Sequence, residues 1–332
     1  MKYLSGFLLL LLLACQSQNK QENEEKTFSN PLFEKGADPW ITLVDGVYYY
    51  CYSRGGSIRI RSAEDITRLP QSDERIIWTP EPDTDHSKEL WAPELHKMGD
   101  HWYVYVAADD GDNFNHRMQI LRSETADINS TFAYVGELAT PQDKWAIDGT
   151  VMPLHDKLYF VWSGWEGDEN VAQNLYIAEM AFPTDISSDR VLISKPDQEW
   201  EQRGSGNGLP TINEGPQILK HEDKTFIIYS ASGSWSDFYC LGSLELTGDD
   251  PMDPDNWKKS DGPVFEGTED VISPGHCSFT TVGDQDWIVY HAVGFKGGGW
   301  DNRYVKMQPF DWKNGRPDFG KPISDGVPIS LP

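Results

Sequence analysis

The sequence predicts an all-β fold, a single-domain five-bladed β-propeller over residues 28–332. Two observations predict this fold. Short runs of β-branched and aromatic residues, bounded by Gly, Asp or Asn, recur along the chain, whereas helical periodicity is nearly absent. A distinctive polar segment also returns at intervals of roughly 55 to 65 residues, as expected when one repeat is one supersecondary unit.

The strand-like runs are arranged as hairpins. In several of them a polar turn precedes a hydrophobic strand, a pattern typical of β-hairpins. These turns are Asp45-Gly46, Gly99-Asp100, His155-Asp156 and Glu222-Asp223. Each repeat therefore contains several strands, which is the content of a propeller blade.

The recurring polar segments come just before the hairpins. They are GADPWI at Asp38, WAPEL at Glu94, IDGTVM at Asp148, NEGPQIL at Glu214 and SPGHCSF at His276. The first strand of a blade runs near the propeller axis, so we expect these polar side chains to share one central cavity. A β-sandwich with scattered loops is the alternative on base rates, and the regular spacing favours the propeller.

The N-terminus resembles a bacterial lipoprotein signal. Lys2 is followed by the apolar run Phe7–Ala14 and then by Cys15, so we expect a signal peptide over residues 1–14 and lipidation of Cys15. The run is too short to span a membrane as a helix. Residues 15–27 are predicted to form a flexible tether because they consist mainly of Gln, Asn, Glu and Lys. We therefore expect a secreted lipoprotein at the outer membrane, cell surface or periplasm of a Gram-negative bacterium, with an uncleaved anchor as the alternative.

Cysteines and short motifs exclude several chemistries. Lipidation of Cys15 would leave three cysteines, Cys51, Cys240 and Cys277. Each stands in an apolar or aromatic segment, which favours buried free thiols, although one disulfide is possible. The chain has no CxxC, HExxH, GxxxxGK[ST] or GxGxxG motif. The usual sequence signatures of zinc, P-loop and dinucleotide sites are therefore missing.

The amino-acid composition limits the kinds of molecule that the protein can be expected to bind. The formal net charge of −25 argues against nucleic acid, because binding to phosphates needs Lys and Arg. The 13 Trp, 14 Tyr and 14 Phe suit strands, and they also suit carbohydrate binding, since flat rings lie against the apolar faces of sugars. We expect a monomer that takes a plant polysaccharide or oligosaccharide and contacts membrane only through its lipid.

Three acidic residues fit the cleavage of a glycosidic bond, which needs one carboxylic acid and one carboxylate. Asp38, Asp148 and Glu214 stand among Gly, Pro and aromatic residues, which indicates low solvation and altered pKa values. A turn role is the alternative for Asp38 and Asp148. Their shared position in the repeat favours catalysis.

The segments ADPWI, WAPEL, AIDGTVM and NEGPQIL, in this order, resemble the motif set of glycoside hydrolase family 43, a family of five-bladed β-propellers. The resemblance implies an inverting mechanism. It implies that Asp38 is the general base, that Glu214 is the general acid, and that Asp148 tunes the acid and orients the substrate. An inverting pair of carboxyl groups stands about 6.5 to 9.5 Å apart to admit water.

The same resemblance extends to further residues. His276 resembles a fifth-blade histidine that contacts an ion, often Ca²⁺, and no other cofactor is implied. Arg303 matches an arginine directed toward the sugar. NFNHRM, which contains His116, and QNLYIAEM at 173–180 are similar to stretches in the family's α-L-arabinofuranosidases. We also expect Trp40, Trp91, Glu94 and His116 to contact substrate.

The sequence thus predicts an enzyme that releases terminal α-L-arabinofuranosyl residues from arabinan or arabinoxylan. β-Xylosidase, endo-arabinanase and galactan-directed activities remain open within the family. An invertase or levansucrase is not expected because the RDP and EC pairs of those enzymes are missing. A non-catalytic glycan-binding propeller is the alternative from another class, but it would lack an acid, and this chain retains all three.

Overall fold

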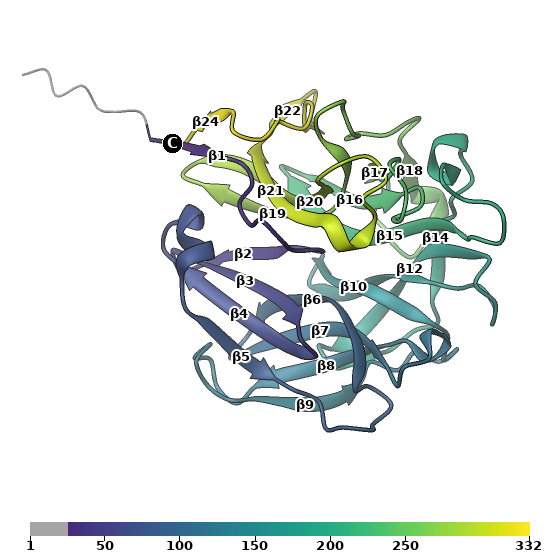
Figure 1. Ribbon diagram of the computed structural model, residues 1–332. Helices are drawn as coiled ribbons and strands as arrows, with labels where there is room; N and C mark the ends of the chain where they lie inside the picture. Colours follow the sequence, from purple (N-terminus) through teal and green to yellow (C-terminus); the bar gives the residue numbers. More distant parts are fainter. Residues whose placement is uncertain (1–25) are drawn as a thin grey trace, which may run out of the picture.

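The computed structural model describes residues 26–332, whose main strands are arranged as five blades around a common centre (Figure 1). The first strands of the five blades contact one another in a closed ring. Their order is β2 (Trp40–Val44), β6 (Lys88–Met98), β10 (Ala146–Leu154), β15 (Thr211–His221), β19 (Ile272–Val282) and back to β2. The predicted five-bladed propeller is therefore confirmed. Its helical content in the described residues consists of short 3₁₀ turns, and none of these is long and apolar enough to cross a membrane.

Each blade is an antiparallel meander that starts at the centre. Blade 1 contains β2 (Trp40–Val44), β3 (Val47–Arg54), β4 (Ser57–Ala63) and β5 (Glu74–Trp78). Blade 2 contains β6 (Lys88–Met98), β7 (His101–Asp109), β8 (Arg117–Ser123) and β9 (Phe132–Glu137). Blade 3 contains β10 (Ala146–Leu154), β11 (Lys157–Gly164) and β12 (Ala172–Phe182), with short β13 (Asp185–Ile186) and β14 (Val191–Ser194) on β12.

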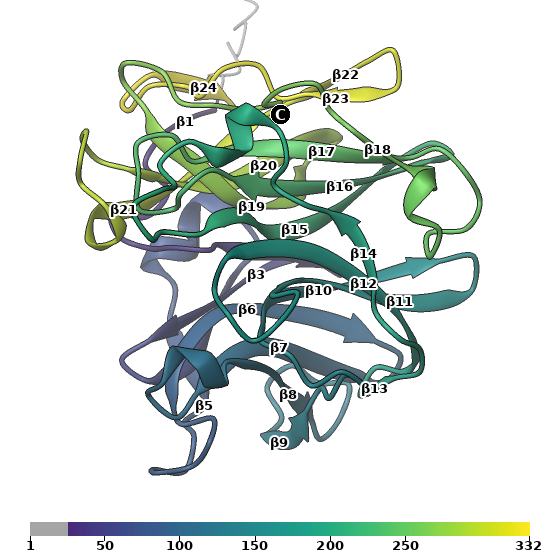
Figure 2. The same cartoon turned by 90° about the vertical axis from the view of Figure 1, so that its right-hand side faces the viewer.

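The last two blades follow the same order. Blade 4 contains β15 (Thr211–His221), β16 (Lys224–Ala231), β17 (Cys240–Leu246) and β18 (Trp257–Lys259), and these strands lie side by side in Figure 2. Blade 5 contains β19 (Ile272–Val282), β20 (Gln285–Val293) and β21 (Arg303–Pro309). A separate hairpin, β22 (Asp311–Lys313) with β23 (Arg316–Asp318), follows blade 5.

The two ends of the described chain close the propeller. β1 (Thr27–Ser29) pairs with β24 (Pro328–Ser330), and Phe33 bridges Val305 at the edge of blade 5 (Figure 1). This pairing covers an edge strand that would otherwise present unpaired backbone groups. Thr27, which we placed in the tether, is thus the first residue of a strand. The signal peptide, Cys15 and the rest of the tether lie outside the described residues.

Apolar side chains fill the space between neighbouring blades. Five buried clusters stand one between each pair of blades, and aromatic rings such as Trp162, Trp287 and Phe226 dominate them. The expected free thiols are confirmed, since Cys51, Cys240 and Cys277 are all buried in these clusters and unpaired.

The inner end of every blade departs from regular strand geometry at the polar segment found in the sequence. Every blade has a residue of positive φ at this segment: Asp38 (47°), Ala92 (43°), Asp148 (55°), Gly215 (55°) and His276 (43°). Four of these lie at β-bulges in the inner strand, and Asp38 lies just before β2. A bulge bends its strand and re-aims a side chain, so the strands turn their polar groups toward the centre.

Candidate active site

A cavity of about 620 Å³ opens at the start of the inner strands. The carboxylates of Asp38, Asp148 and Glu214 line it, together with His276 and Arg303. The sequence predicted that these five residues, which come from blades 1, 3, 4 and 5, share one site, and the fold brings them together. A hollow of about 780 Å³ beside residues 166–169 and 195–197 contains none of them.

Asp38 lies beside an arginine and two histidines at one side of the cavity. Its Oδ1 lies 3.3 Å from a guanidinium nitrogen of Arg303 and 3.2 Å from Nδ1 of His276. Its backbone N–H donates to Nδ1 of His291 at 3.2 Å. Burial alone would raise the pKa of Asp38, but His276, Arg303 and His291 together hold it well below its usual range. Asp38 is therefore an anion at neutral pH.

Asp148 is an almost completely buried carboxylate at the bulge of β10. Its Oδ2 accepts a hydrogen bond from the backbone N–H of Gly215 at 3.0 Å and lies 3.8 Å from Nδ1 of His276. Burial, followed by the negative charges of Glu214 and Asp38, raises the pKa of Asp148 well above its ordinary value. The neighbouring acids therefore oppose the loss of its proton.

Glu214 is the second buried acid, at the bulge of β15. Its Oε1 accepts a hydrogen bond from the Tyr239 hydroxyl at 2.7 Å. Burial raises the pKa of Glu214 to about 7, the Tyr239 hydrogen bond opposes that rise, and the charge of Asp38 adds to it. A large fraction of Glu214 is therefore protonated near neutral pH, and it can donate a proton.

His276 lies between the two aspartates. Its pKa is lowered, mainly by burial, so it is neutral at pH 7. Ca²⁺ takes six to eight oxygen ligands. Among residues 26–332, the one group of three carboxylate or imidazole donors within 4.8 Å of each other is Glu89, Asp109 and His116, which does not include His276. The side chains around His276 therefore do not form a calcium shell, and no chemical step is assigned to an ion there.

Tryptophans form the walls of the cavity. Trp91, as predicted from WAPEL, lines it, and Trp145, Trp235 and Trp300 line it as well. The ring of Trp91 stacks on the imidazole of His116 at 4.0 Å between centroids. His116 is itself fully buried and is not part of the cavity lining, so it supports the wall from behind.

His116 is thus one of three residues that we expected to contact substrate but that do not line the cavity, and Trp40 and Glu94 are the other two. The indole of Trp40 packs at the interface of blades 1 and 2, where Nε1 donates to the Leu95 carbonyl at 2.8 Å. Glu94 is buried, and its carboxylate is bound by Gln217 and by His96. Neither residue lines the cavity. The WAPEL strand turns Trp91 to the cavity, and beyond its bulge Glu94 faces the interior of the propeller.

Sequence reasoning missed several residues of the site. Tyr239 and His291 contact the acids, and their rings stack in parallel 5.6 Å apart. They occur in DFYCLG and IVYHAV, which resemble ordinary buried strands. A weak signal existed for Tyr239, since the polar run SGSWSD precedes it. Trp235 and Ser234 of that run line the cavity.

Five blades around a cavity with one carboxylate of lowered pKa and two of raised pKa define a β-propeller with the acid and base groups of a glycoside hydrolase site. The family model for glycosyl hydrolases family 43 matches residues 28–317, and the chain belongs to this family.

Several known proteins are similar to this chain. The extracellular exo-α-(1→5)-L-arabinofuranosidase of Streptomyces avermitilis is 35% identical over 320 residues, which cover 91% of this chain and 65% of that protein. The α-L-arabinofuranosidase B of Pyricularia oryzae is 33% identical over 92% of this chain and 65% of its own length. The chain thus spans 65% of the length of these two relatives. The crystal structure of an α-L-arabinofuranosidase from Lactobacillus brevis is 34% identical, with a TM-score of 0.83 over 90% of this chain and 98% of that one.

Proposed function

We propose that this protein is an inverting exo-acting glycosidase that releases terminal α-L-arabinofuranosyl residues from arabinan or arabinoxylan. The observation that carries the proposal is the contrast within one cavity between Asp38, whose pKa is lowered, and Glu214, whose pKa is raised to about 7. Inverting hydrolysis needs a carboxylate and a carboxylic acid at the same pH. The names of the relatives above support arabinofuranose as the sugar.

In this proposal Asp38 is the general base. The guanidinium group of Arg303 lies 3.3 Å from the Asp38 carboxylate and favours its ionised form. The carboxylate accepts a proton from a water molecule as the water attacks the anomeric carbon. His291 holds the Asp38 backbone through the N–H···Nδ1 hydrogen bond, which fixes a residue of positive φ.

Glu214 is the general acid and Asp148 its partner. Glu214 gives its proton to the glycosidic oxygen as the bond breaks, and the Tyr239 hydroxyl holds the other carboxyl oxygen. Burial and the charge of Glu214 oppose the ionisation of Asp148, and burial and the charge of Asp38 oppose that of Glu214. Charge repulsion between Asp148 and Glu214 is reciprocal. The pair therefore keeps a proton available for the leaving oxygen.

The other activities within the family stay as alternatives. Solved structures titled as an endo-arabinase and as a xylan β-1,4-xylosidase share the fold at 18% and 14% identity. At such identity they support the fold alone. A catalytically silent glycan-binding propeller is disfavoured because the chain keeps all three carboxylates in one cavity.

The location also belongs to the proposal. Two of the curated relatives are named extracellular enzymes, and together with the apolar N-terminus this supports secretion. We propose that residues 1–14 are cleaved as a signal, that lipidated Cys15 anchors the mature protein, and that residues 28–332 act as a monomeric catalytic domain. A calcium ion near His276 would be held mainly through water, and the proposed reaction does not depend on it.

A side-by-side substrate screen tests the function. The enzyme is assayed with 4-nitrophenyl α-L-arabinofuranoside, β-D-xyloside and β-D-galactoside, and with linear α-1,5-arabinan. We expect hydrolysis of the arabinofuranoside and release of arabinose alone from arabinan. Xyloside cleavage without arabinofuranoside cleavage would contradict the substrate, and release of longer arabino-oligosaccharides would contradict exo action.

A further inference from the structure

Glu89 is held in a costly backbone conformation at the edge of the cavity. It lies in a β-bulge at the start of β6, between the pairs Lys88–Asp109 and Trp91–Ala107, and its φ is 43°. Glutamate gains nothing locally from this left-handed conformation, which costs about 1 to 3 kcal/mol and persists only when its surroundings enforce it. Such strain occurs preferentially at functional sites.

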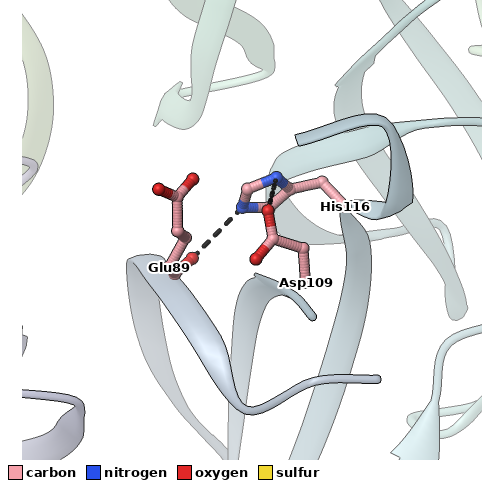
Figure 3. A group of neighbouring side chains, drawn as sticks. All are labelled: Glu89, Asp109 and His116. Atoms are coloured by element: carbon pink, nitrogen blue, oxygen red, sulfur yellow. Dashed lines mark hydrogen bonds and ion pairs between the residues drawn. The ribbon is translucent and has the colours of Figure 1, made fainter. Parts of the chain in front are cut away.

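A buried pair enforces the conformation of Glu89. Nε2 of His116 donates to the carbonyl oxygen of Glu89 at 3.1 Å, while Nδ1 of His116 faces Oδ2 of Asp109 at 3.0 Å (Figure 3). His116 and Asp109 are fully buried. The second oxygen of Asp109 accepts the Gly111 N–H at 2.9 Å, which fixes the carboxylate. The carbonyl group of Glu89 is therefore held by a fully buried imidazole.

The side chain of Glu89 lies beside this buried pair. Its carboxylate is exposed, lines the cavity and has an oxygen within 4.8 Å of side-chain atoms of Asp109 and His116 (Figure 3), but it makes no hydrogen bond or ion pair within the described residues. Trp91, two residues further along β6, lines the same wall and is less exposed. Glu89 therefore stands nearer the cavity mouth than Trp91.

We propose that the Glu89 carboxylate accepts hydrogen bonds from hydroxyl groups of the sugar on the leaving-group side of the scissile bond, and that the Asp109–His116 pair positions it. This proposal rests on the proposed function. The mouth of the cavity is where the rest of the glycan must lie when its terminal residue occupies the floor. A free carboxylate there suits a neutral polyol, because hydroxyl groups donate to it, and it disfavours anionic chains.

Comparing a sugar leaving group with an aryl leaving group tests the proposal. Glu89→Ala is expected to lower kcat/KM for α-1,5-arabinobiose about 10- to 100-fold, as expected for loss of hydrogen bonds to a charged acceptor. It should change kcat/KM for 4-nitrophenyl α-L-arabinofuranoside less than about threefold, because the aryl group offers no hydroxyl. Glu89→Gln, which keeps one acceptor oxygen, should fall between. Glu124→Ala, another exposed glutamate of blade 2 outside the cavity, is the matched control and should match wild type on both substrates.

The positioning role has its own test. Asp109→Asn should also weaken arabinobiose cleavage selectively, and adding it to Glu89→Ala should cause no further loss on arabinobiose, because the effect passes through Glu89. Equal losses on both substrates, or no loss on either, would overturn the proposal. If the wild-type enzyme cleaved neither arabinobiose nor 4-nitrophenyl α-L-arabinofuranoside, the proposed function itself would be wrong. That outcome differs from one in which only the role of Glu89 fails.

Discussion

The backbone N–H of Gly215 donates to Oδ2 of Asp148 at 3.0 Å, which joins the inner strand of blade 4 to that of blade 3. Gly215 follows Glu214 directly, so this bond sets the separation of the two acids. The φ of Gly215 is +55°, and a Cβ added there would lie 3.1 Å from the ring of His276. One peptide unit therefore controls how three site residues stand relative to each other.

Gly215→Ala tests that coupling. An added methyl group must displace His276 or the strand. The left-handed backbone conformation also costs alanine about 1 kcal/mol or more of conformational free energy relative to glycine. We expect kcat to fall at least about tenfold, because small misplacements of catalytic groups are costly. Gly46→Ala is the control, since Gly46 has a φ of +80° in an open turn with no neighbour. Equal activity of the two variants would contradict the coupling.

Tyr239→Phe should move the alkaline limb of the kcat/KM profile to higher pH. The Tyr239 hydroxyl stabilises ionised Glu214 and so lowers its pKa. Without that hydroxyl the pKa of Glu214 rises above about 7, and the acid stays protonated to higher pH. Activity at neutral pH should stay within about tenfold of wild type. A profile that shifts to lower pH would refute this reading of the hydrogen bond.

Asp148→Asn should move the alkaline limb of the kcat/KM profile to lower pH, opposite to the effect of Tyr239→Phe. Glu214 raises the pKa of Asp148, and charge repulsion is reciprocal, so removing the Asp148 charge lets Glu214 ionise at lower pH. We also expect a loss in kcat of about 100-fold, because substrate orientation suffers. When Asp148→Asn and Tyr239→Phe are assayed in identical buffers, the alkaline limbs of their kcat/KM profiles should lie at different pH values. Coincident limbs would mean that Glu214 does not set the alkaline limb.

Glu201 is a structural counterpart of these acids, and its loss should affect stability. It is completely buried and binds Asn213, Tyr229 and Lys259 through its two oxygens at 2.9 to 3.0 Å. Glu201→Ala removes these three hydrogen bonds and leaves the buried Tyr229 hydroxyl without its partner, although Lys259 keeps Asp197 and Asn213 keeps the Ile212 carbonyl. It should lower the free energy of unfolding by about 2 to 4 kcal/mol. Urea denaturation measures this, with exposed Glu199→Ala as the control. A loss below about 1 kcal/mol would contradict it.

The repeat in the sequence predicted the architecture because the same feature recurs in each blade. A polar segment that interrupts a strand pattern at regular intervals marks the bulges at Asp148, Glu214 and His276, and these bulges point to one centre. The order of the strands and the gathering of the acids follow from that regularity. The role of each acid came from the family resemblance.

The sequence could not predict side-chain direction next to a bulge. An extra residue in a strand reverses the alternation of its side chains. Trp91 therefore faces the cavity while Glu94 faces the interior, although both belong to one short motif. Tyr239 and His291 were missed for the opposite reason, because nothing irregular in the local sequence marks them. Tyr239 contacts Glu214 on another strand of blade 4, and His291 contacts Asp38 across the blade 5–blade 1 boundary.

The anomeric configuration of the first-formed sugar tests the central claim most directly. Proton NMR follows the wild-type enzyme as it hydrolyses an α-L-arabinofuranoside, before mutarotation equilibrates the product. With Asp38 as base and Glu214 as acid, water attacks from the face opposite the leaving group, so β-L-arabinofuranose should appear first. Initial release of the α-anomer would contradict the account, because it would require one of these carboxylates to act as a nucleophile.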